Sequence, residues 1–308
     1  MNPLSAIYGA ASALRNSLFD RGVLTARRLG RPVVSVGNLS VGGAGKTPFV
    51  IALGELLKAH SVRFDVLSRG YGRKTRGVRI VEPDGSAADF GDEPLLLARR
   101  LDVPVIVGES RYEAGQLAEK KFATQVHILD DGFQHRSLAR NFDIVLLTEL
   151  DFEDSLLPSG RLREPLASLA RADAIVLPET AIDHAILRGK IVWRIKREIA
   201  VVDPPEAPIV FCGIARPEQF LAQVRATGIL PSAEITFRDH HPYGLRDIDR
   251  LLSARAKVDA GGFLTTEKDV VNLGQLWSAL APLAIAVLKV MVDNPAYIVD
   301  TILARIEV

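Results

Sequence analysis

The sequence predicts an α/β protein, with a doubly wound parallel sheet followed by a second, smaller α/β lobe that is joined to it by a two-stranded link. Three observations predict this fold class. Short β-branched runs alternate with helical patterns along the first two-thirds of the chain, a glycine-rich loop follows the first run, and the alternation starts again after a proline-rich segment at 203–208. The runs are continuously apolar, which is typical of strands covered by helices on both faces.

The first part of the chain carries the predicted parallel sheet. We expect strands at residues 33–36, 62–67, 103–107, 126–129, 144–147 and 175–177, with helices such as 48–59 and 111–122 between them. In an open sheet of this kind, ligands bind beyond the carboxyl ends of the strands.

The second part repeats the alternation on a smaller scale. Apolar residues at 191–195 and 198–202 flank the polar pair Lys196-Arg197, and we interpret them as the two strands of a link. Strands are then expected at 209–211, 234–237, 262–265 and 284–290, and helices at 217–226, 246–257 and near 273–280. The predicted domains are a core at 1–192, a two-stranded linker at 193–207 and a smaller α/β lobe at 208–308, whose C-terminal helix at 294–308 can pack back on the core.

Composition sets limits on the class of protein. Of the 308 residues, 48% are hydrophobic and 24% are charged, an ordinary globular balance, and the net charge of +1 provides no basic field for nucleic acid. Cys212 is the single cysteine, which excludes an internal disulfide and a cysteine metal cage. No apolar run reaches the roughly 18 to 20 residues of a spanning helix. We expect no nucleic-acid partner and see no sign of a protein partner.

The N-terminal segment combines an apolar stripe with basic residues. The stripe has helical spacing, and five arginines follow with one acid against them. The stripe residues are Leu4, Ile7, Tyr8, Ala11, Leu14 and Leu18, and the arginines are Arg15, Arg21, Arg27, Arg28 and Arg31. Two interpretations are open at this point: a helix docked on the core, or an amphipathic helix on an anionic membrane surface.

The strongest local motif is the glycine-rich loop between the strand at 33 and the helix from 48. It reads Ser40-Val41-Gly42-Gly43-Ala44-Gly45-Lys46-Thr47. Glycines let successive backbone N–H groups converge on phosphate oxygens, and the following helix directs its positive end at the same charge. Lys46 is expected to reach the β- and γ-phosphates and Thr47 to bind Mg²⁺. The sheet is therefore expected to be P-loop NTPase-like, although serine stands at the first position, where glycine is usual.

An acidic pair follows the strand at 126–129. Asp130 and Asp131 come at its carboxyl end, where a P-loop protein needs an acid for its metal ion. A solvated turn is the plainer alternative.

Four further loops carry polar residues. Residues 68–73 hold two arginines on either side of two glycines, which suits a phosphate ligand, with a solvated surface loop as the alternative. Asp92 starts a helix where it could be an N-cap, and 158–165 carry Arg161, Arg163 and Glu164. Asp239-His240-His241 follows a strand, but no third metal ligand stands close in sequence, so an acid–base or orienting role is the better interpretation.

Together these segments resemble the tetraacyldisaccharide 4′-kinase family. The matching segments, in order along residues ~35 to 270, are 37–48, 68–73, 91–94, 130–135, 162–165, 239–240 and 265–269. Serine at the first loop position is usual in that family. The resemblance implies ATP-dependent phosphorylation of the 4′-hydroxyl of a tetraacyldisaccharide 1-phosphate to give lipid IVA in lipid A biosynthesis, with ATP and Mg²⁺ as cofactors. It also implies a peripheral position on the cytoplasmic side of the bacterial inner membrane, which favours the membrane interpretation of residues 1–31.

The resemblance also implies residue roles. Asp92 matches the general base and His240 its histidine partner, which replaces the N-cap interpretation of Asp92. Asp130 and Asp131, with Thr47, match the metal site, and Lys46 acts on the phosphates. Other matched or expected active-site positions are Arg69, Tyr71, Arg111, Gln134, His135, Arg163 and Glu164. A carboxylate base suits the chemistry, because a sugar hydroxyl is a poor nucleophile at neutral pH.

Two alternatives from other classes were weighed against this assignment. A P-loop switch or metallochaperone GTPase would need a guanine-reading Asn-Lys-x-Asp motif, which the sequence lacks. A soluble small-molecule kinase would have no use for the N-terminal stripe.

Overall fold

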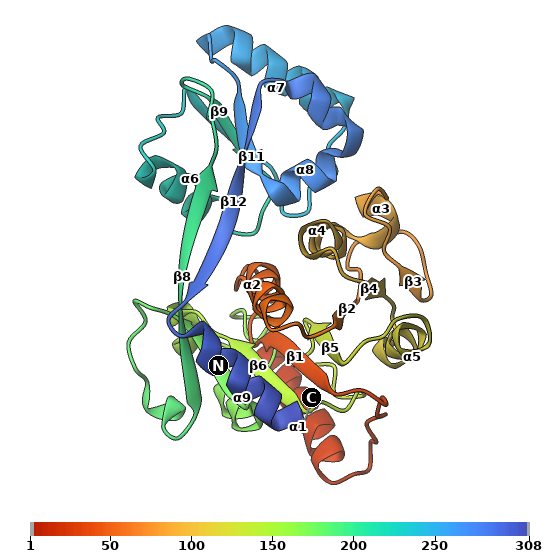
Figure 1. Cartoon of the computed structure of the whole chain (residues 1–308). Helices are drawn as coiled ribbons and strands as arrows, with labels where there is room; N and C mark the ends of the chain where they lie inside the picture. The colour runs from red at the N-terminus through yellow and green to blue at the C-terminus, as the bar shows by residue number, and fades with distance from the viewer. Residues whose placement is uncertain (1–2, 307–308) are drawn as a thin grey trace.

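The computed structural model describes residues 3–306 and contains one continuous sheet. Its twelve strands lie in the order β10-β9-β11-β12-β8-β7-β6-β1-β5-β2-β4-β3. Neighbouring strands are parallel except for the pairs β3–β4 and β8–β12. The predicted α/β class with a mostly parallel sheet is confirmed, and Figure 1 shows its two lobes, one above the other.

The first lobe contains the strands on both sides of β1. They are β1 (Val33–Asn38), β2 (Phe64–Ser68), β3 (Arg79–Ile80), β4 (Val105–Val107), β5 (Val126–Asp130), β6 (Phe142–Leu146) and β7 (Ala174–Pro178). Its helices are α1 (Pro3–Asp20), α2 (Lys46–Ala59), α3 (Ala87–Phe90), α4 (Asp92–Leu101) and α5 (Arg111–Lys121), with 3₁₀ turns at Glu149–Phe152, Leu166–Arg171 and Ala185–Leu187.

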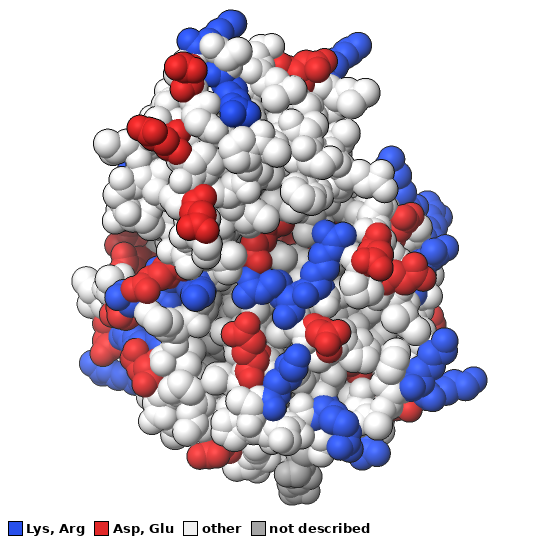
Figure 2. Space-filling model, turned by 45° about the horizontal axis from the view of Figure 1, so that its top comes forward, with Lys and Arg blue, Asp and Glu red and all other residues white. Residues whose placement is uncertain are grey.

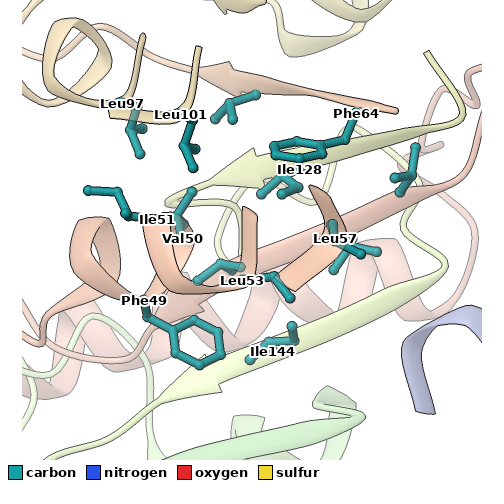
Figure 3. Close-up of a cluster of buried hydrophobic side chains, with 14 of the residues drawn as sticks. Phe49, Val50, Ile51, Leu53, Leu57, Phe64, Leu97, Leu101, Ile128 and Ile144 are labelled. Carbon is teal, nitrogen blue, oxygen red and sulfur yellow. The ribbon is translucent and has the colours of Figure 1, made fainter. Parts of the chain in front are cut away.

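Alternate residues of the central strands face two separate cores. Val34, Val66 and Ile128 point to the face covered by α2 and α4, where Phe49, Leu53 and Leu57 of α2 fill the space (Figure 3). Val33 and Leu129 point to the opposite face, which α5 covers. Both faces are buried, which accounts for the continuously apolar strand sequences.

The link between the lobes consists of β8 (Ile191–Val201) and β12 (Leu283–Val292). Residues 191–201 form one unbroken strand, rather than the two strands expected on either side of Lys196-Arg197. The strand continues because both polar side chains find partners without interrupting it. Lys196 pairs with Glu198 in solvent, and Arg197 donates to the Ala44 carbonyl in the glycine-rich loop. The antiparallel partner, β12, begins at Leu283, 82 positions after β8 ends at Val201.

The second lobe consists of β9 (Ile209–Cys212), β10 (Ala233–Thr236) and β11 (Phe263–Thr266) with α6 (Pro217–Ala226), α7 (Leu245–Val258) and α8 (Glu267–Leu273). A 3₁₀ turn at Gly274–Leu280 follows α8, so the helix expected near 273–280 begins earlier and changes type. The N-cap hydroxyl of Thr266, which accepts from the Asp269 N–H, explains the earlier start.

The C-terminal helix α9 (Pro295–Ile306) returns to the first lobe. Ile298, Val299, Ile302 and Ile306 are buried in the same core as Phe142 and Trp193.

Helix α1 packs on the first lobe through a face of small and polar residues. Ser5 donates to the Leu156 carbonyl, Tyr8 to the Arg163 carbonyl and Asn16 to Glu164. Part of the apolar stripe faces away: Leu4, Ile7 and Leu14 are 60%, 66% and 63% exposed, whereas Tyr8 of the same stripe bonds to the lobe. The docked-helix interpretation therefore describes one side of the segment, and the membrane interpretation of the other side stays a prediction. Within residues 3–306, no helix has the length and apolarity needed to span a bilayer.

Candidate active site

The glycine-rich loop joins β1 to α2 at the carboxyl edge of the sheet. Gly42 and Gly45 adopt positive φ values of 94° and 81°, which side chains disfavour, and α2 begins at Lys46. The loop, 40–47, thus stands between a parallel strand and a helix N-terminus, as the sequence predicts. The hydroxyl-bearing residues at its ends, Ser40 and Thr47, are buried.

Lys46 lies in a network of four side chains. Its Nζ is 2.9 Å from Asn38 Oδ1 and 3.3 Å from Asp131 Oδ1. Arg163 binds Asp131 through both terminal nitrogens, at 3.1 and 2.9 Å, and also donates to Asn38 Oδ1. Although burial raises the pKa of Asp131, these two cations hold it well below its usual range. Asp131 is therefore ionised at any physiological pH.

Asp130 has the opposite environment. It is fully enclosed, its Oδ2 accepts from the Ser68 hydroxyl at 3.1 Å, and its Oδ1 has no partner. Burial, together with the charges of Glu93 and Asp131, raises the pKa of Asp130 to about 7. A buried carboxylate oxygen without a donor is a site that a cation can complete.

Asp92 and His240 meet across the two lobes. Gly91 is the cap position of α4, and Asp92 is its first helical residue, with Oδ1 accepting from the Glu93 N–H at 2.9 Å. His240 Nδ1 lies 2.8 Å from Asp92 Oδ2, and Asn272 Nδ2 lies 3.1 Å from the same atom. His240 has φ 55°, a strained value for a bulky residue of the kind that collects at functional sites. The carboxylate is thus oriented from both lobes.

Lys268 lies beside both members of this pair. Its Nζ lies 3.3 Å from His240 Nε2, 3.2 Å from Asp239 Oδ1 and 3.8 Å from Asp92 Oδ2. Because an ammonium group can only donate, Nε2 accepts and the imidazole proton is on Nδ1, directed at Asp92. Burial raises the pKa of Asp92, but the contacts with His240 and Lys268 outweigh burial and lower it below its ordinary value. Bonding to Asp92 raises the pKa of His240.

The glycine-flanked loop at 68–73 lies beside this pair. A Cβ on Gly91 would come within 2.8 Å of the Tyr71 carbonyl, so only glycine permits the approach. The Tyr71 ring lies 5.5 Å from that of His240. Further along the edge, Arg69 and Arg111 act on each other and on His135 through their charges, and burial with these charges lowers the pKa of His135 to about 4. His135 is therefore neutral at pH 7.

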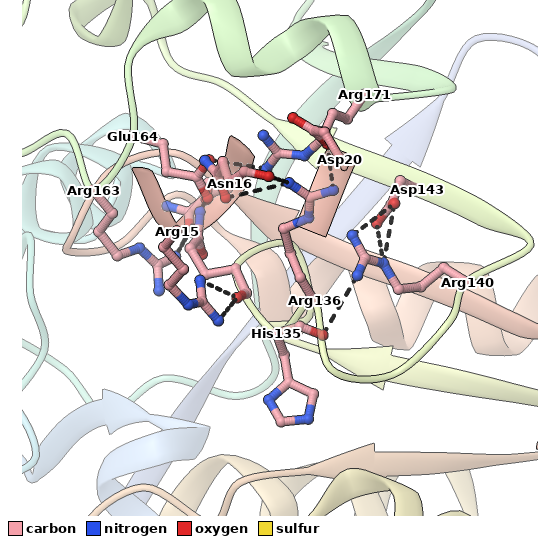
Figure 4. A network of polar contacts seen from close by, with 12 residues as sticks. Arg15, Asn16, Asp20, His135, Arg136, Arg140, Asp143, Arg163, Glu164 and Arg171 are labelled. Atoms are coloured by element: carbon pink, nitrogen blue, oxygen red, sulfur yellow. Dashed lines mark hydrogen bonds and ion pairs between the residues drawn. The ribbon is translucent and has the colours of Figure 1, made fainter. Parts of the chain in front are cut away.

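Gln134 and Glu164 connect the edge with α1, and Figure 4 shows Arg15, Asn16 and Glu164 of these contacts. Gln134 Nε2 donates to the backbone carbonyl of Asn38, and the backbone carbonyl of Gln134 accepts from Arg15 at 3.1 Å. Glu164 is buried and accepts from Asn16 at 2.6 Å and from Arg171 at 2.9 Å. Helix α1 thus contacts both the loop that carries Gln134 and the loop that carries Glu164.

Charges of both signs are mixed on the face of the molecule that Figure 2 shows. Figure 2 shows basic and acidic side chains interspersed across it, with several lysine and arginine side chains near its middle. Among residues 3–306, no cluster of three or more His, Cys, Asp or Glu suits a metal ion. His241 stacks on Phe237 and pairs with Asp247 at 3.1 Å, so it belongs to the second lobe and not to the site at Asp92.

Sequence reasoning left four residues of the site unassigned. Asn38 and Lys268 lie in segments that match the family, but no role was predicted for them. Asn272 and Arg197 belong to no motif that would indicate a functional residue. All four act through contacts distant in sequence, such as Asn272 with Asp92 over 180 residues.

A sequence model of the tetraacyldisaccharide-1-P 4′-kinase family matches residues 1–307. The chain is 49% identical to the tetraacyldisaccharide 4′-kinase of Koribacter versatilis over 318 aligned positions, which cover 100% of this chain and 99% of that protein. It is 40% identical to the enzyme of the same name from Aquifex aeolicus, with 88% of each chain covered. The crystal structure of the apo form of LpxK from Aquifex aeolicus in complex with ATP superposes with a TM-score of 0.82 at 35% identity, over 99% of this chain and 98% of that one. The chain belongs to the tetraacyldisaccharide 4′-kinase family.

Proposed function

We propose that this kinase transfers the γ-phosphoryl group of ATP to the 4′-hydroxyl of a tetraacyldisaccharide 1-phosphate, giving lipid IVA for lipid A biosynthesis. The observation that carries the proposal is the Asp92–His240 contact of 2.8 Å, which orients a carboxylate of the same lobe that carries the glycine-rich loop before α2. The names of the relatives and the ATP of the structural neighbour support the same substrates.

In the proposed reaction, Asp92 takes the proton of the acceptor hydroxyl as its oxygen forms a bond to the γ-phosphorus. The bond between that phosphorus and the β,γ-bridging oxygen breaks, and ADP leaves with the electron pair. His240 keeps Asp92 oriented by donating from Nδ1. Lys46 and the backbone N–H groups of the loop stabilise charge on the phosphates, and positioning supplies most of the acceleration. A positioned base typically contributes about 10²- to 10⁴-fold.

A magnesium ion fits the residues at the loop. Asp130, Asp131 and Thr47 present carboxylate and hydroxyl oxygens, which are the ligands Mg²⁺ prefers, and the partnerless Oδ1 of Asp130 is an open position. When bound, Mg²⁺ neutralises charge on the β- and γ-phosphates. Arg69, Tyr71, Arg111, Gln134, His135, Arg163 and Glu164 are proposed as the surrounding active-site residues.

The proposed location is the cytoplasmic face of the inner membrane. The exposed stripe of α1 supports it, because a basic amphipathic helix lies in the interface of an anionic membrane with its apolar face inward. The acceptor is itself a lipid of that membrane. Arg21, Arg27 and Arg28, which are exposed after α1, would meet the lipid headgroups.

We further propose the functional division 1–192, 193–207 and 208–308, with α9 packed back on the core. Separate apolar clusters on either side of the link support it. Limited proteolysis within 193–207, followed by mass measurement of the fragments, tests the boundaries.

The activity is tested by transfer of radiolabel from γ-labelled ATP to a tetraacylated disaccharide 1-phosphate in mixed micelles, with GTP as the control nucleotide. Label is expected in the lipid with ATP and at the 4′-position after product analysis. Absence of labelled lipid with folded, ATP-binding enzyme would reject the proposed acceptor.

A further inference from the structure

Two half-buried arginines beside the glycine-rich loop form no ion pair with a carboxylate. Arg197 projects from β8 and donates to the Ala44 carbonyl, while its Nε is buried with no partner. Arg216 stands just before α6 in the second lobe, and its Nη2 is also buried with no partner. From these two residues we propose a phosphate-recognition pair, in which Arg197 and Arg216 bind the phosphate chain of the nucleotide held by the loop.

Both side chains are in contact with the loop itself. A Cβ on Gly45 would come within 2.6 Å of the Arg197 guanidinium, so that group lies directly against the glycine. A Cβ on Gly43 would lie 3.6 Å from Ala215 and 3.8 Å from Arg216 Cγ. The loop is therefore flanked by one cation from the link and one from the second lobe.

Three described arginines, Arg111, Arg197 and Arg216, combine a buried partnerless nitrogen with no ion pair to a carboxylate. Arg111 belongs to the active-site edge described above, and the charge of Asp151 acts on Arg216 without forming an ion pair. Arg73, Arg163 and Arg171 also have a buried nitrogen without a partner, but each forms an ion pair with a carboxylate. Within residues 3–306, no carboxylate forms an ion pair with Arg197 or Arg216. Burial lowers the pKa of Arg197, and the charge of Arg216 lowers it further.

Two neighbouring half-buried cations repel each other, and an anion between them relieves that cost. A phosphate group is the appropriate anion, because the planar guanidinium fork matches its oxygens and because the loop collects phosphates at the same place. Such a phosphate has two sources, the nucleotide and the 1-phosphate of the lipid. Contact with Gly43 and Gly45 favours the nucleotide. The second lobe would then contribute directly to ATP binding, and not only through His240.

Calorimetry of Mg-ATP binding, without lipid, tests the pair in Arg197→Gln, Arg216→Gln and the double variant. Each single variant is expected to bind ATP about ten- to hundredfold more weakly, the loss of one or two charge-assisted hydrogen bonds. Affinity for AMP, which has one phosphate, is expected to fall less than affinity for ATP. Matched controls are Lys196→Gln, next to Arg197 but paired with Glu198 in solvent, and Arg225→Gln on α6, paired with Glu234. Both should bind ATP normally.

The melting temperature separates ligand binding from structural support. Since Arg216 has no carboxylate partner, Arg216→Gln should melt no lower than wild type without ligand, while the upward shift caused by ATP should shrink. An unchanged ATP affinity with a lower melting temperature would overturn the inference and make the pair structural. An unchanged ATP affinity with a raised KM for the lipid would also overturn it and assign the pair to the lipid phosphate. The inference rests on the proposed function only for occupancy of the loop by ATP, so failure of transfer to the lipid would leave this binding test intact.

Discussion

His240 Nδ1 and Asp92 Oδ2 are 2.8 Å apart although 148 residues separate them in the chain. One comes from a loop of the second lobe and the other from the first residue of α4, so their contact requires both lobes to be in place. The base and its orienting group thus depend on the link formed by β8 and β12.

Asp92→Asn should lower kcat by about 10²- to 10⁴-fold, because it removes the proposed base but keeps the shape of the side chain. ATP affinity should be nearly unchanged. His240→Ala should also lower kcat, and if the pair acts as a unit, the double variant should lose far less than the product of the two single losses. His241→Ala serves as the control, since His241 binds Asp247. An Asp92→Asn enzyme with full kcat would transfer the role of base to Asp130 or Asp131.

Lys268→Met should shift the acid limb of the kcat/KM profile upward. Contacts with His240 and Lys268 keep the pKa of Asp92 below 3.8, so wild-type activity should fall only at strongly acidic pH. Without the ammonium group, less charge offsets the effect of burial, so the pKa of Asp92 should rise. Lys268→Arg should keep the wild-type profile. Identical profiles for the methionine variant and wild type would remove Lys268 from the site.

Lys46→Ala and Thr47→Ala should each reduce transfer by on the order of 10²-fold or more, because they remove preorganised contacts to the phosphates and the metal. The fold should persist: Lys46 is held by Asn38 and Asp131 on the surface of the site, not in an apolar core. Circular dichroism and radiolabel transfer are measured on the same preparations, and near-normal turnover of either folded variant would contradict the loop assignment.

Leu4, Ile7 and Leu14 changed together to Ser should abolish sedimentation with anionic vesicles while leaving the melting temperature within a few degrees of wild type. Exposed substitutions of this kind typically change stability by about 0.5 kcal/mol or less each. The control is Ile182→Ser with Leu230→Ser, which removes apolar side chains outside α1 that are even more exposed, at 84% and 77%. Unchanged vesicle binding of the triple variant would show that the stripe is not the anchor.

His127→Ala should destabilise the protein by about 3 kcal/mol or more, because it leaves the Asp65 carboxylate buried without its partner. The two groups lie 2.9 Å apart with no exposed side-chain surface. Burial lowers the pKa of His127, but Asp65 outweighs burial and raises it above 6.5. The folded state therefore binds the proton more tightly, so this contribution is complete below pH 6.5 and is lost as pH rises through the raised pKa. Urea unfolding of both proteins between pH 5 and 9 should show the difference narrowing at the upper end.

The parallel sheet, the loop at 40–47 and the family could be predicted because each depends on local sequence. Apolar runs such as 33–36 and glycines flanking Lys46 carry their signal within a few residues. The pairing of β8 with β12 could not, because the two strands have no complementary pattern that distinguishes this partner from others. The role of Asp92 is likewise hidden from local sequence. A carboxylate at the start of any helix is stabilised by the helix dipole, so Asp92 looks like an N-cap. Only His240, Lys268 and Asn272, all from the second lobe, give Asp92 a different environment. The assigned roles of Asp92 and His240 stay predictions.

The position of α9 has a consequence for how the polypeptide is made. Translation delivers β1 to β7 first, then the whole second lobe, and only at the end the helix whose Ile298, Val299 and Ile302 close the core beside Phe142 and Trp193. A nascent chain therefore carries an uncovered apolar surface on its first lobe until synthesis is complete. Domains usually fold in the order in which they leave the ribosome. Here the core of the first lobe is completed only when α9 has been made. A premature stop before residue 295 would release a product with its nucleotide loop intact and that surface still open to aggregation.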